Sequence, residues 1–177
     1  MLIHVPYYSQ HLDVLDSEWK NRACAVTCIK MLLESKGVVA PPLDEMIKHG
    51  LELGAHGPSG WIHSGLINLA SKYNVALSHA EWRKSESKTS EELNEEGIRF
   101  LVSKLRSRNP VIVSVIKKFT EKDKFHMVVL VGFQEQDGVV KGFLYHDPDN
   151  MIYADGENQV VSLEVFRDTW RRMAIFG

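Results

Sequence analysis

The sequence lacks the features that mark several large classes of protein. Its 177 residues contain no apolar run of about eighteen residues, so no membrane-spanning helix is predicted. Lysine and arginine total 21 against 23 acidic residues, and the basic residues are scattered along the chain. Nucleic acid is therefore not an expected partner, because binding to phosphates requires a concentrated positive charge. P-loop, GxGxxG, HExxH and EF-hand patterns are also missing, and no cofactor is predicted.

Cysteine is scarce as well. The chain has two, Cys24 and Cys28, in the apolar segment "RACAVTCIKMLL". They cannot build a disulfide framework, and a bond across one helical turn is geometrically awkward, so both are predicted to be free thiols. A structural zinc site would need four ligands, for example both cysteines with His4 and His11, but this cysteine spacing is uncommon in zinc fingers. We therefore predict no metal site.

The N-terminus shows no pattern of a secretory signal. Met1 is followed directly by "LIHVPYYSQ", without a basic segment or an apolar stretch of signal-peptide length. We expect a cytoplasmic location if Met1 is native, and an extracytoplasmic location if a leader has been removed. Nothing resembles a coiled-coil seam, so the sequence does not predict the oligomeric state.

The pattern of hydrophobic residues predicts a single domain over residues 1–177, of the α+β class. Apolar residues recur at helical spacing before Pro110, whereas short runs rich in Val, Ile, Phe and Tyr follow it. We therefore expect a helical lobe over about residues 1–109 and an antiparallel β lobe over about 110–177. Helices are predicted over residues 24–36, from 43 to 50 or 54, from Ser59 onward, and over about 92–107. The first is apolar around most of its circumference and is predicted to be buried.

In the β lobe, strands are predicted at "VIVSVI", "HMVVLVGF", "GFLYHD" and "MAIFG", with a short helix at "SLEVFRDTW". Asp137-Gly138, between the second and third strands, predicts a tight hairpin turn. If the strands on either side of this turn pair, His126 and Asp147 lie at the same open end of the hairpin.

Four residues could together perform thiol-dependent acyl transfer, which requires a thiolate, a base, a group that orients the base and donors for the oxyanion. Cys24 lies in the first turn of the predicted helix, where free N–H groups and the helix dipole favour a thiolate. His126 opens an apolar strand and could be the base, and Asp147 could orient its ring. Gln10 could donate a side-chain N–H to the oxyanion, beside the backbone N–H of Cys24.

Each of these residues also has a simpler interpretation. A cysteine at the start of an apolar helix is more often an inert buried thiol, and a histidine is more often structural or exposed. Asp-Pro after a strand is ordinarily a turn. The residues alone therefore leave the catalytic interpretation open, while Cys28, one turn deeper, is predicted to be part of the core.

Seven segments, taken in order, carry a family resemblance: "VPYYSQ", "DSEWKNRACAVTCIKMLL", "GWIHSGLINLASKYN", "NPVIVSV", "FHMVVLVGF", "YHDPDN" and "FRDTW". Together they resemble papain-like cysteine peptidases of the bacteriocin-processing, double-glycine type and their stand-alone relatives. The resemblance extends from residue 5 to the C-terminus. It implies the papain-like fold, in which a helical lobe carries the cysteine and a β lobe carries the histidine and the aspartate.

The resemblance also implies a role for each candidate residue. Cys24 would be the nucleophile, His126 the base, Asp147 the third member of the triad and Gln10 a contributor to the oxyanion hole. A peptide or protein would be the substrate.

Trp61 and His63, in "GWIHSG", lie in a family-like motif and could line the substrate cleft. The simpler expectation is a tryptophan packed under a neighbouring helix and an exposed histidine.

Two departures from the family pattern affect the expected function. The family usually has glycine directly after the nucleophile, whereas this chain has Ala25, whose methyl group could crowd the site. The best-known members are fused to an export ATPase, and this sequence has no Walker motif, so cleavage coupled to export within this polypeptide is not expected. The leading expectation is a hydrolase of peptide or amide bonds that works through an acyl-enzyme. The alternatives are a thiol acyltransferase and an inactive peptide-binding module.

Overall fold

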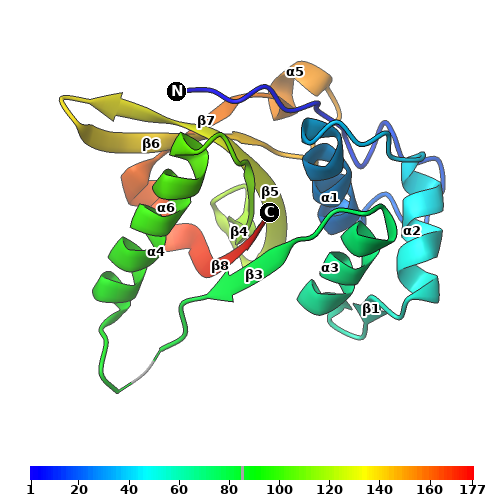
Figure 1. Ribbon diagram of the computed structural model, residues 1–177, viewed down its shortest axis with the longest axis horizontal. Coiled ribbons are helices and arrows are strands. Elements are labelled where there is room, and N and C mark those ends of the chain that lie inside the picture. Colours follow the sequence, from blue (N-terminus) through cyan, green and yellow to red (C-terminus); the bar gives the residue numbers. More distant parts are fainter. Residues whose placement is uncertain (85) are drawn as a thin grey trace.

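The computed structural model describes residues 1–84 and 86–177, without the side chain of residue 123. It has two lobes, with helices gathered in one and a sheet flanked by helices in the other (Figure 1). The helical lobe contains α1 (Cys24–Ser35), α2 (Leu43–Glu52), the short hairpin of β1 (His56–Gly57) and β2 (Gly60–Trp61), and α3 (His63–Lys72). Among the described residues, no helix is both long and apolar enough to cross a membrane.

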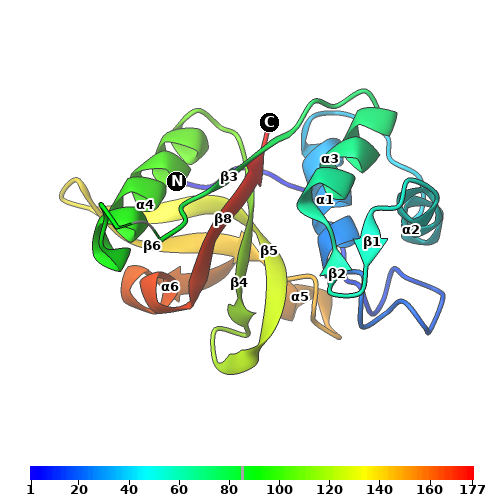
Figure 2. The same cartoon turned by 90° about the horizontal axis from the view of Figure 1, so that it is seen from below.

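Helix α1 is the buried central helix that its sequence predicts. Every residue from Ala25 to Leu33 is buried, because apolar side chains cover nearly the whole circumference and must be packed on all sides. The helix contacts α2 and α3 on one side and strand β5 on the other. Figure 2 shows α1 and the β1–β2 hairpin facing β5 at the boundary between the lobes. The N-terminus of α1 therefore meets the β lobe.

The β lobe is built on one antiparallel sheet of six strands, in the order β3-β8-β4-β5-β6-β7. The strands are β3 (Ser78–Glu81), β4 (Val111–Lys117), β5 (Glu121–Gln136), β6 (Val139–His146), β7 (Gln159–Ser162) and β8 (Trp170–Phe176). Strand β5 pairs with β4 along its first part and with β6 along its second. Two short helices, α5 (Tyr153–Gly156) and α6 (Leu163–Thr169), lie between β6 and β8 in sequence.

The hairpin between β5 and β6 turns at Asp137-Gly138, as predicted. Gln136 pairs with Val139, so the loop has two residues. Both have positive φ, 52° at Asp137 and 75° at Gly138, which is the conformation of a type I′ turn. The turn fixes the register that brings the open end of this hairpin to the boundary with α1.

The division of the chain near residue 109 is wrong, because two elements before it belong with the sheet. Strand β3 pairs with β8, and helix α4 (Ser90–Arg106) contacts β4, β5 and β8. The change from one lobe to the other lies between Lys72, the end of α3, and Ser78, the start of β3. An amphipathic pattern shows which face of α4 is apolar but does not show which lobe covers it.

Three predicted boundaries also shift. Helix α4 begins at Ser90, because Thr89 and Glu92 form a capping box around its first turn. Helix α3 begins at His63 rather than near Ser59, which lies in the turn between β1 and β2. Strand β5 begins at Glu121, before His126, because Glu121 pairs with Lys117 of β4 beyond a shift in the register.

Candidate active site

Cys24 is the first residue of helix α1, and its partly exposed thiol borders a cavity between the lobes. No side chain caps this helix end, so the first N–H groups of the helix are available to other acceptors. The backbone N–H groups of Ala25 and Met127 act on the Cys24 thiol to lower its pKa. Both N–H groups stabilise a negative sulfur.

The cavity has a volume of about 580 Å³ and takes its walls from both lobes. The helical lobe contributes the first turn of α1, the segment just before it, and the β1–β2 hairpin. The β lobe contributes residues of β4, β5 and β8. The residues on the cavity wall are Asn21, Arg22, Cys24, Ala25, His56, Gly57, Pro58, Ser59, Gly60, Trp61, His63, Ser114, Phe125, His126, Met127 and Arg171.

His126 and Asp147 come together across the β5–β6 hairpin, as the sequence predicts. Val129 pairs with His146, which places Asp147 just beyond the end of β6 and close to His126. His126 Nε2 lies 2.6 Å from Asp147 Oδ1, and the two residues are only 4% and 6% exposed. Because Nε2 is held by the carboxylate, Nδ1 is the ring nitrogen left for Cys24. The aspartate thus fixes the orientation of the ring.

The electrostatics of Cys24 and His126 favour a thiolate–imidazolium pair. Burial acts to raise the pKa of Cys24, but the charge of His126 and a hydrogen bond with it lower that pKa below its ordinary value. Burial acts to lower the pKa of His126, but the charge of Cys24 and the hydrogen bond with Asp147 raise it well above its ordinary value. Each group therefore stabilises the charged form of the other.

Cys28 has the opposite environment, although it lies one turn further along the same helix. It is completely buried, and its thiol lies 3.4 Å from the carbonyl oxygen of Met127, to which it donates. Burial raises the pKa of Cys28, and the charges of Cys24 and Asp147 raise it further. The predictions that both cysteines are free and that Cys28 belongs to the core are confirmed.

The N-terminal motif "VPYYSQ" fastens the loop that carries Asp147. The Tyr7 hydroxyl donates to the carbonyl oxygen of Asp147 at 2.7 Å, and the Ser9 hydroxyl donates to that of Asn150 at 2.6 Å. His146 Nε2 lies 3.0 Å from the carbonyl oxygen of Val5. These contacts join the N-terminal segment to the loop after β6 and hold the aspartate in place.

Gln10 is almost fully buried next to this loop, but it is not among the residues that line the cavity. Its backbone N–H donates to the carbonyl oxygen of Pro148 at 2.9 Å, and its side-chain amide donates to that of Lys20 at 2.8 Å. The amide oxygen has no partner among the described residues. Its contribution to an oxyanion hole stays a prediction.

Trp61 and His63 both border the cavity that contains Cys24. The indole N–H of Trp61 donates to the carbonyl oxygen of Arg22 at 2.7 Å, and its ring lies against Gly50 of α2, so it also packs on a helix as the simpler expectation stated. His63 Nδ1 lies 3.3 Å from Glu81 Oε1. A role of either residue in binding substrate stays a prediction.

The sequence analysis did not single out Asp149, which supports Asp147. Its backbone N–H donates to Asp147 Oδ1 at 2.9 Å. Its own carboxylate lies 2.6 Å from His11 Nε2 and 2.7 Å from the Lys117 ammonium. Burial acts to raise its pKa, but the hydrogen bonds from Lys117 and His11 lower it, so a carboxylate is maintained beside Asp147. The signal available in the sequence was the second aspartate of "HDPD".

The described residues contain no group of three or more His, Cys, Asp or Glu side chains that could hold a metal ion. His11, a ligand in the alternative zinc site, instead contacts Asp149. Cys28 instead donates to a backbone carbonyl.

Several solved structures with a similar fold are described as peptidases or proteases. A protein from Bacillus anthracis described as a C39-like peptidase superposes with a TM-score of 0.67 at 19% identity, over 99% of this chain and 96% of that one. A double-glycine motif protease from an AMS/PCAT transporter, solved with its leader peptide, has a TM-score of 0.59 at 15% identity, over 99% and 92%. The peptidase domain of Streptococcus ComA, a bifunctional ABC transporter of a quorum-sensing pathway, has a TM-score of 0.59 at 20% identity, over 88% and 90%. The fold is therefore that of a papain-like cysteine peptidase.

The sequence profile of the Peptidase_C39 like family matches residues 2–175. The chain belongs to this family, in agreement with the resemblance found in its motifs. Among curated proteins, no significant relative is found.

Proposed function

We propose that the protein is a cysteine-dependent hydrolase that cleaves peptide or amide bonds through an acyl-enzyme. One observation carries the proposal: Cys24, with a lowered pKa, and the His126–Asp147 pair meet at a cavity that is open to solvent. A perturbed thiol beside a base inside a cavity is the arrangement that thiol catalysis requires. The double-glycine motif protease solved with a leader peptide supports a peptide as the substrate, because that structure shows the fold holding one.

In the proposed reaction, the Cys24 thiolate attacks the carbonyl carbon of the scissile bond and forms a tetrahedral oxyanion. The oxyanion is bound by the backbone N–H of Cys24 and by the second side-chain N–H of Gln10, because the first donates to Lys20. The His126 imidazolium then gives its proton to the leaving amine as the C–N bond breaks, which leaves a thioester on Cys24. Neutral His126 next takes a proton from water, and the resulting hydroxide attacks the thioester. Collapse of this second intermediate releases the acid and restores the ion pair.

Ala25 favours the alternative of an inactive peptide-binding module, because the family usually has glycine there. Its side chain is buried at the wall of the cavity, and its backbone N–H acts to lower the pKa of Cys24. Alanine presents the same backbone N–H as glycine would. This observation supports the active enzyme.

The test is cleavage of a mixture of peptides by the full chain, read as new peptide termini by mass spectrometry. We expect cleavage by the wild type and by Cys28→Ala, the matched control, and none by Cys24→Ala. Addition of hydroxylamine should yield hydroxamates, because it intercepts the thioester, and a strong preference for an added amine over water would indicate an acyltransferase. Binding of peptides without any new termini would show a binding module, and cleavage by Cys24→Ala would overturn the proposal.

A further inference from the structure

The cavity at Cys24 continues into a second hollow on the β-lobe side. This hollow has a volume of about 260 Å³ and shares His63, Ser114 and Arg171 with the first. The remaining residues of its wall are Glu81, Trp82, Arg83, Lys84, Arg172 and Met173. A peptide that lies across Cys24 can therefore extend past Arg171 into a second subsite.

The walls of the two hollows carry a positive charge that the rest of the chain does not share. Their basic residues are Arg22, Arg83, Lys84, Arg171 and Arg172, and their one acidic residue is Glu81. Glu81 is already engaged by Arg83 and His63. The whole chain has a net charge of −2, whereas the groove formed by these walls has five basic residues against one acidic residue. A concentrated positive field with low-dielectric walls selects ligands that carry negative charge.

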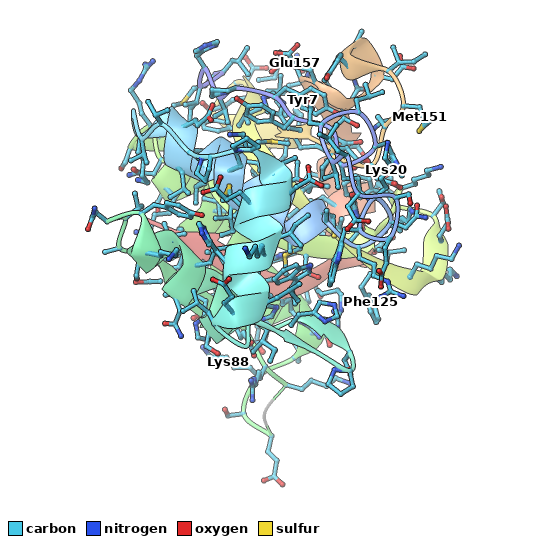
Figure 3. All side chains as sticks on the ribbon, turned by 90° about the vertical axis from the view of Figure 1, so that its right-hand side faces the viewer. Tyr7, Lys20, Lys88, Phe125, Met151 and Glu157 are labelled. Carbon is cyan, nitrogen blue, oxygen red and sulfur yellow. The ribbon has the colours of Figure 1, made fainter. Side chains whose placement is uncertain are left out.

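Arg171 is the basic residue at the junction of the two hollows. Its guanidinium lies over the ring of Phe125, with Cζ 3.5 Å from the ring centroid. Phe125, labelled in Figure 3, is 58% exposed and directly precedes His126. Stacking on an aromatic face restrains the guanidinium while its N–H edge stays free to donate.

The guanidinium of Arg171 has no carboxylate partner within the described part of the chain. Arg83, Arg99, Arg106 and Arg167 each lie within 4.0 Å of a glutamate, whereas no such pair involves Arg171. Arg171 is exposed in strand β8, so its guanidinium is accessible to a ligand without first breaking an ion pair.

We propose that Arg171 binds a carboxylate of the peptide substrate and so selects substrates that are acidic at one fixed position. This inference rests on the proposed function and adds a substrate class to it. The carboxylate comes either from an aspartate or glutamate side chain or from the C-terminus of the peptide. Arginine suits both sources, because its planar fork donates two parallel hydrogen bonds to one carboxylate.

The experiment compares matched peptides in which glutamate replaces glutamine at successive positions around the cleaved bond, each with a free and an amidated C-terminus. With the wild type we expect one position at which glutamate raises kcat/KM by about 10- to 100-fold. Arg171→Gln should reduce that preference to about twofold or less, and Arg171→Lys should retain part of it. The matched control is Arg99→Gln, which removes the same charge from an exposed site on α4 and should leave the preference unchanged. A preference that follows the free C-terminus rather than the glutamate identifies the α-carboxylate as the source.

The same peptides are measured by fluorescence anisotropy for binding to Cys24→Ala, with and without Arg171→Gln. Acid-selective binding that depends on Arg171, with no cleavage by the wild type, would overturn the proposed hydrolase and support the carboxylate site. Cleavage without any preference for acid, or a preference that persists in Arg171→Gln, would overturn the carboxylate site and leave the hydrolase standing. Thermal melting of each variant establishes that the protein is folded.

Discussion

The first and second turns of helix α1 carry the same side chain in opposite environments. Cys24 borders a cavity, faces His126 and has a lowered pKa, whereas Cys28 is sealed in the core and has a raised pKa. Both thiols are subject to the raising effect of burial. The difference comes from the charge and hydrogen bonding of His126 and from the N–H groups at the uncapped helix start. The pKa of a cysteine is thus set by the polar groups around its thiol and not by burial alone.

The largest effect is expected from removing each thiol in turn. Cys24→Ala should lower peptide cleavage by at least about 10³-fold, because no nucleophile remains. Cys28→Ala should leave kcat/KM within about threefold but lower the free energy of unfolding by about 1–2 kcal/mol, since it leaves a small gap in the core. Cleavage kinetics give the loss of activity in each variant, and chemical denaturation gives the loss of stability. Equal losses of activity in the two variants would contradict the different roles of Cys24 and Cys28.

His126→Ala should make the two cysteines alike. Without the imidazolium, nothing opposes the effect of burial strongly enough to hold the pKa of Cys24 down, so that pKa should rise above its ordinary value. Cleavage should fall by about 10²- to 10⁴-fold with the loss of the general acid and base. Titration of the thiolate ultraviolet absorbance, with Cys28→Ala as the background, gives the pKa directly. An unchanged pKa would show that His126 does not form the ion pair.

Asp147→Asn should have a smaller effect and narrow the pH range of activity. The ion pair exists above the lowered pKa of Cys24 and below the raised pKa of His126. Loss of the carboxylate charge lowers the pKa of His126, so the alkaline limb of the rate profile should move to lower pH. Because an amide oxygen can still accept from the ring, as in Cys-His-Asn enzymes, we expect a loss of only about 10- to 100-fold. An alkaline limb at the same pH as in the wild type would show that Asp147 does not raise the pKa of His126.

Ala25→Gly should have the smallest effect. The backbone N–H that acts to lower the pKa of Cys24 is kept, so kcat/KM should change by less than about threefold. The free energy of unfolding should fall by up to about 1 kcal/mol, because glycine loses more backbone entropy in a helix. A rise in kcat/KM beyond about tenfold would show that the methyl group crowds the site, which is the concern that the family pattern raised.

The fold was predictable where a local pattern decides it. The apolar circumference of α1 and the Asp137-Gly138 turn are such patterns, and the turn places His126 beside Asp147. The position of α4 was not predictable, because its apolar face fits either lobe. Strand β3 was missed because its residues are mostly exposed, and it is defined by backbone pairing with β8.

The candidate site, like the fold, was predictable only where a local pattern decides it. Cys24, His126 and Asp147 follow from helix and hairpin geometry together with the family motifs. Asp149 and Arg171 could not be predicted, since their importance depends on their neighbours in space. Asp149 lies beside Lys117 and His11. Arg171 lies over the ring of Phe125. No periodicity in the sequence encodes such contacts between distant segments.

The most direct test is alkylation of the native protein by iodoacetamide at about pH 6, where an ordinary thiol is almost wholly protonated. Peptide mapping reports the modification of both cysteines in the same molecules. The account predicts that Cys24 is alkylated much faster than a small model thiol, that this advantage disappears in His126→Ala, and that Cys28 stays unmodified until the protein unfolds. A rate at Cys24 equal to that of the model thiol, or equal to that at Cys28, would contradict the account.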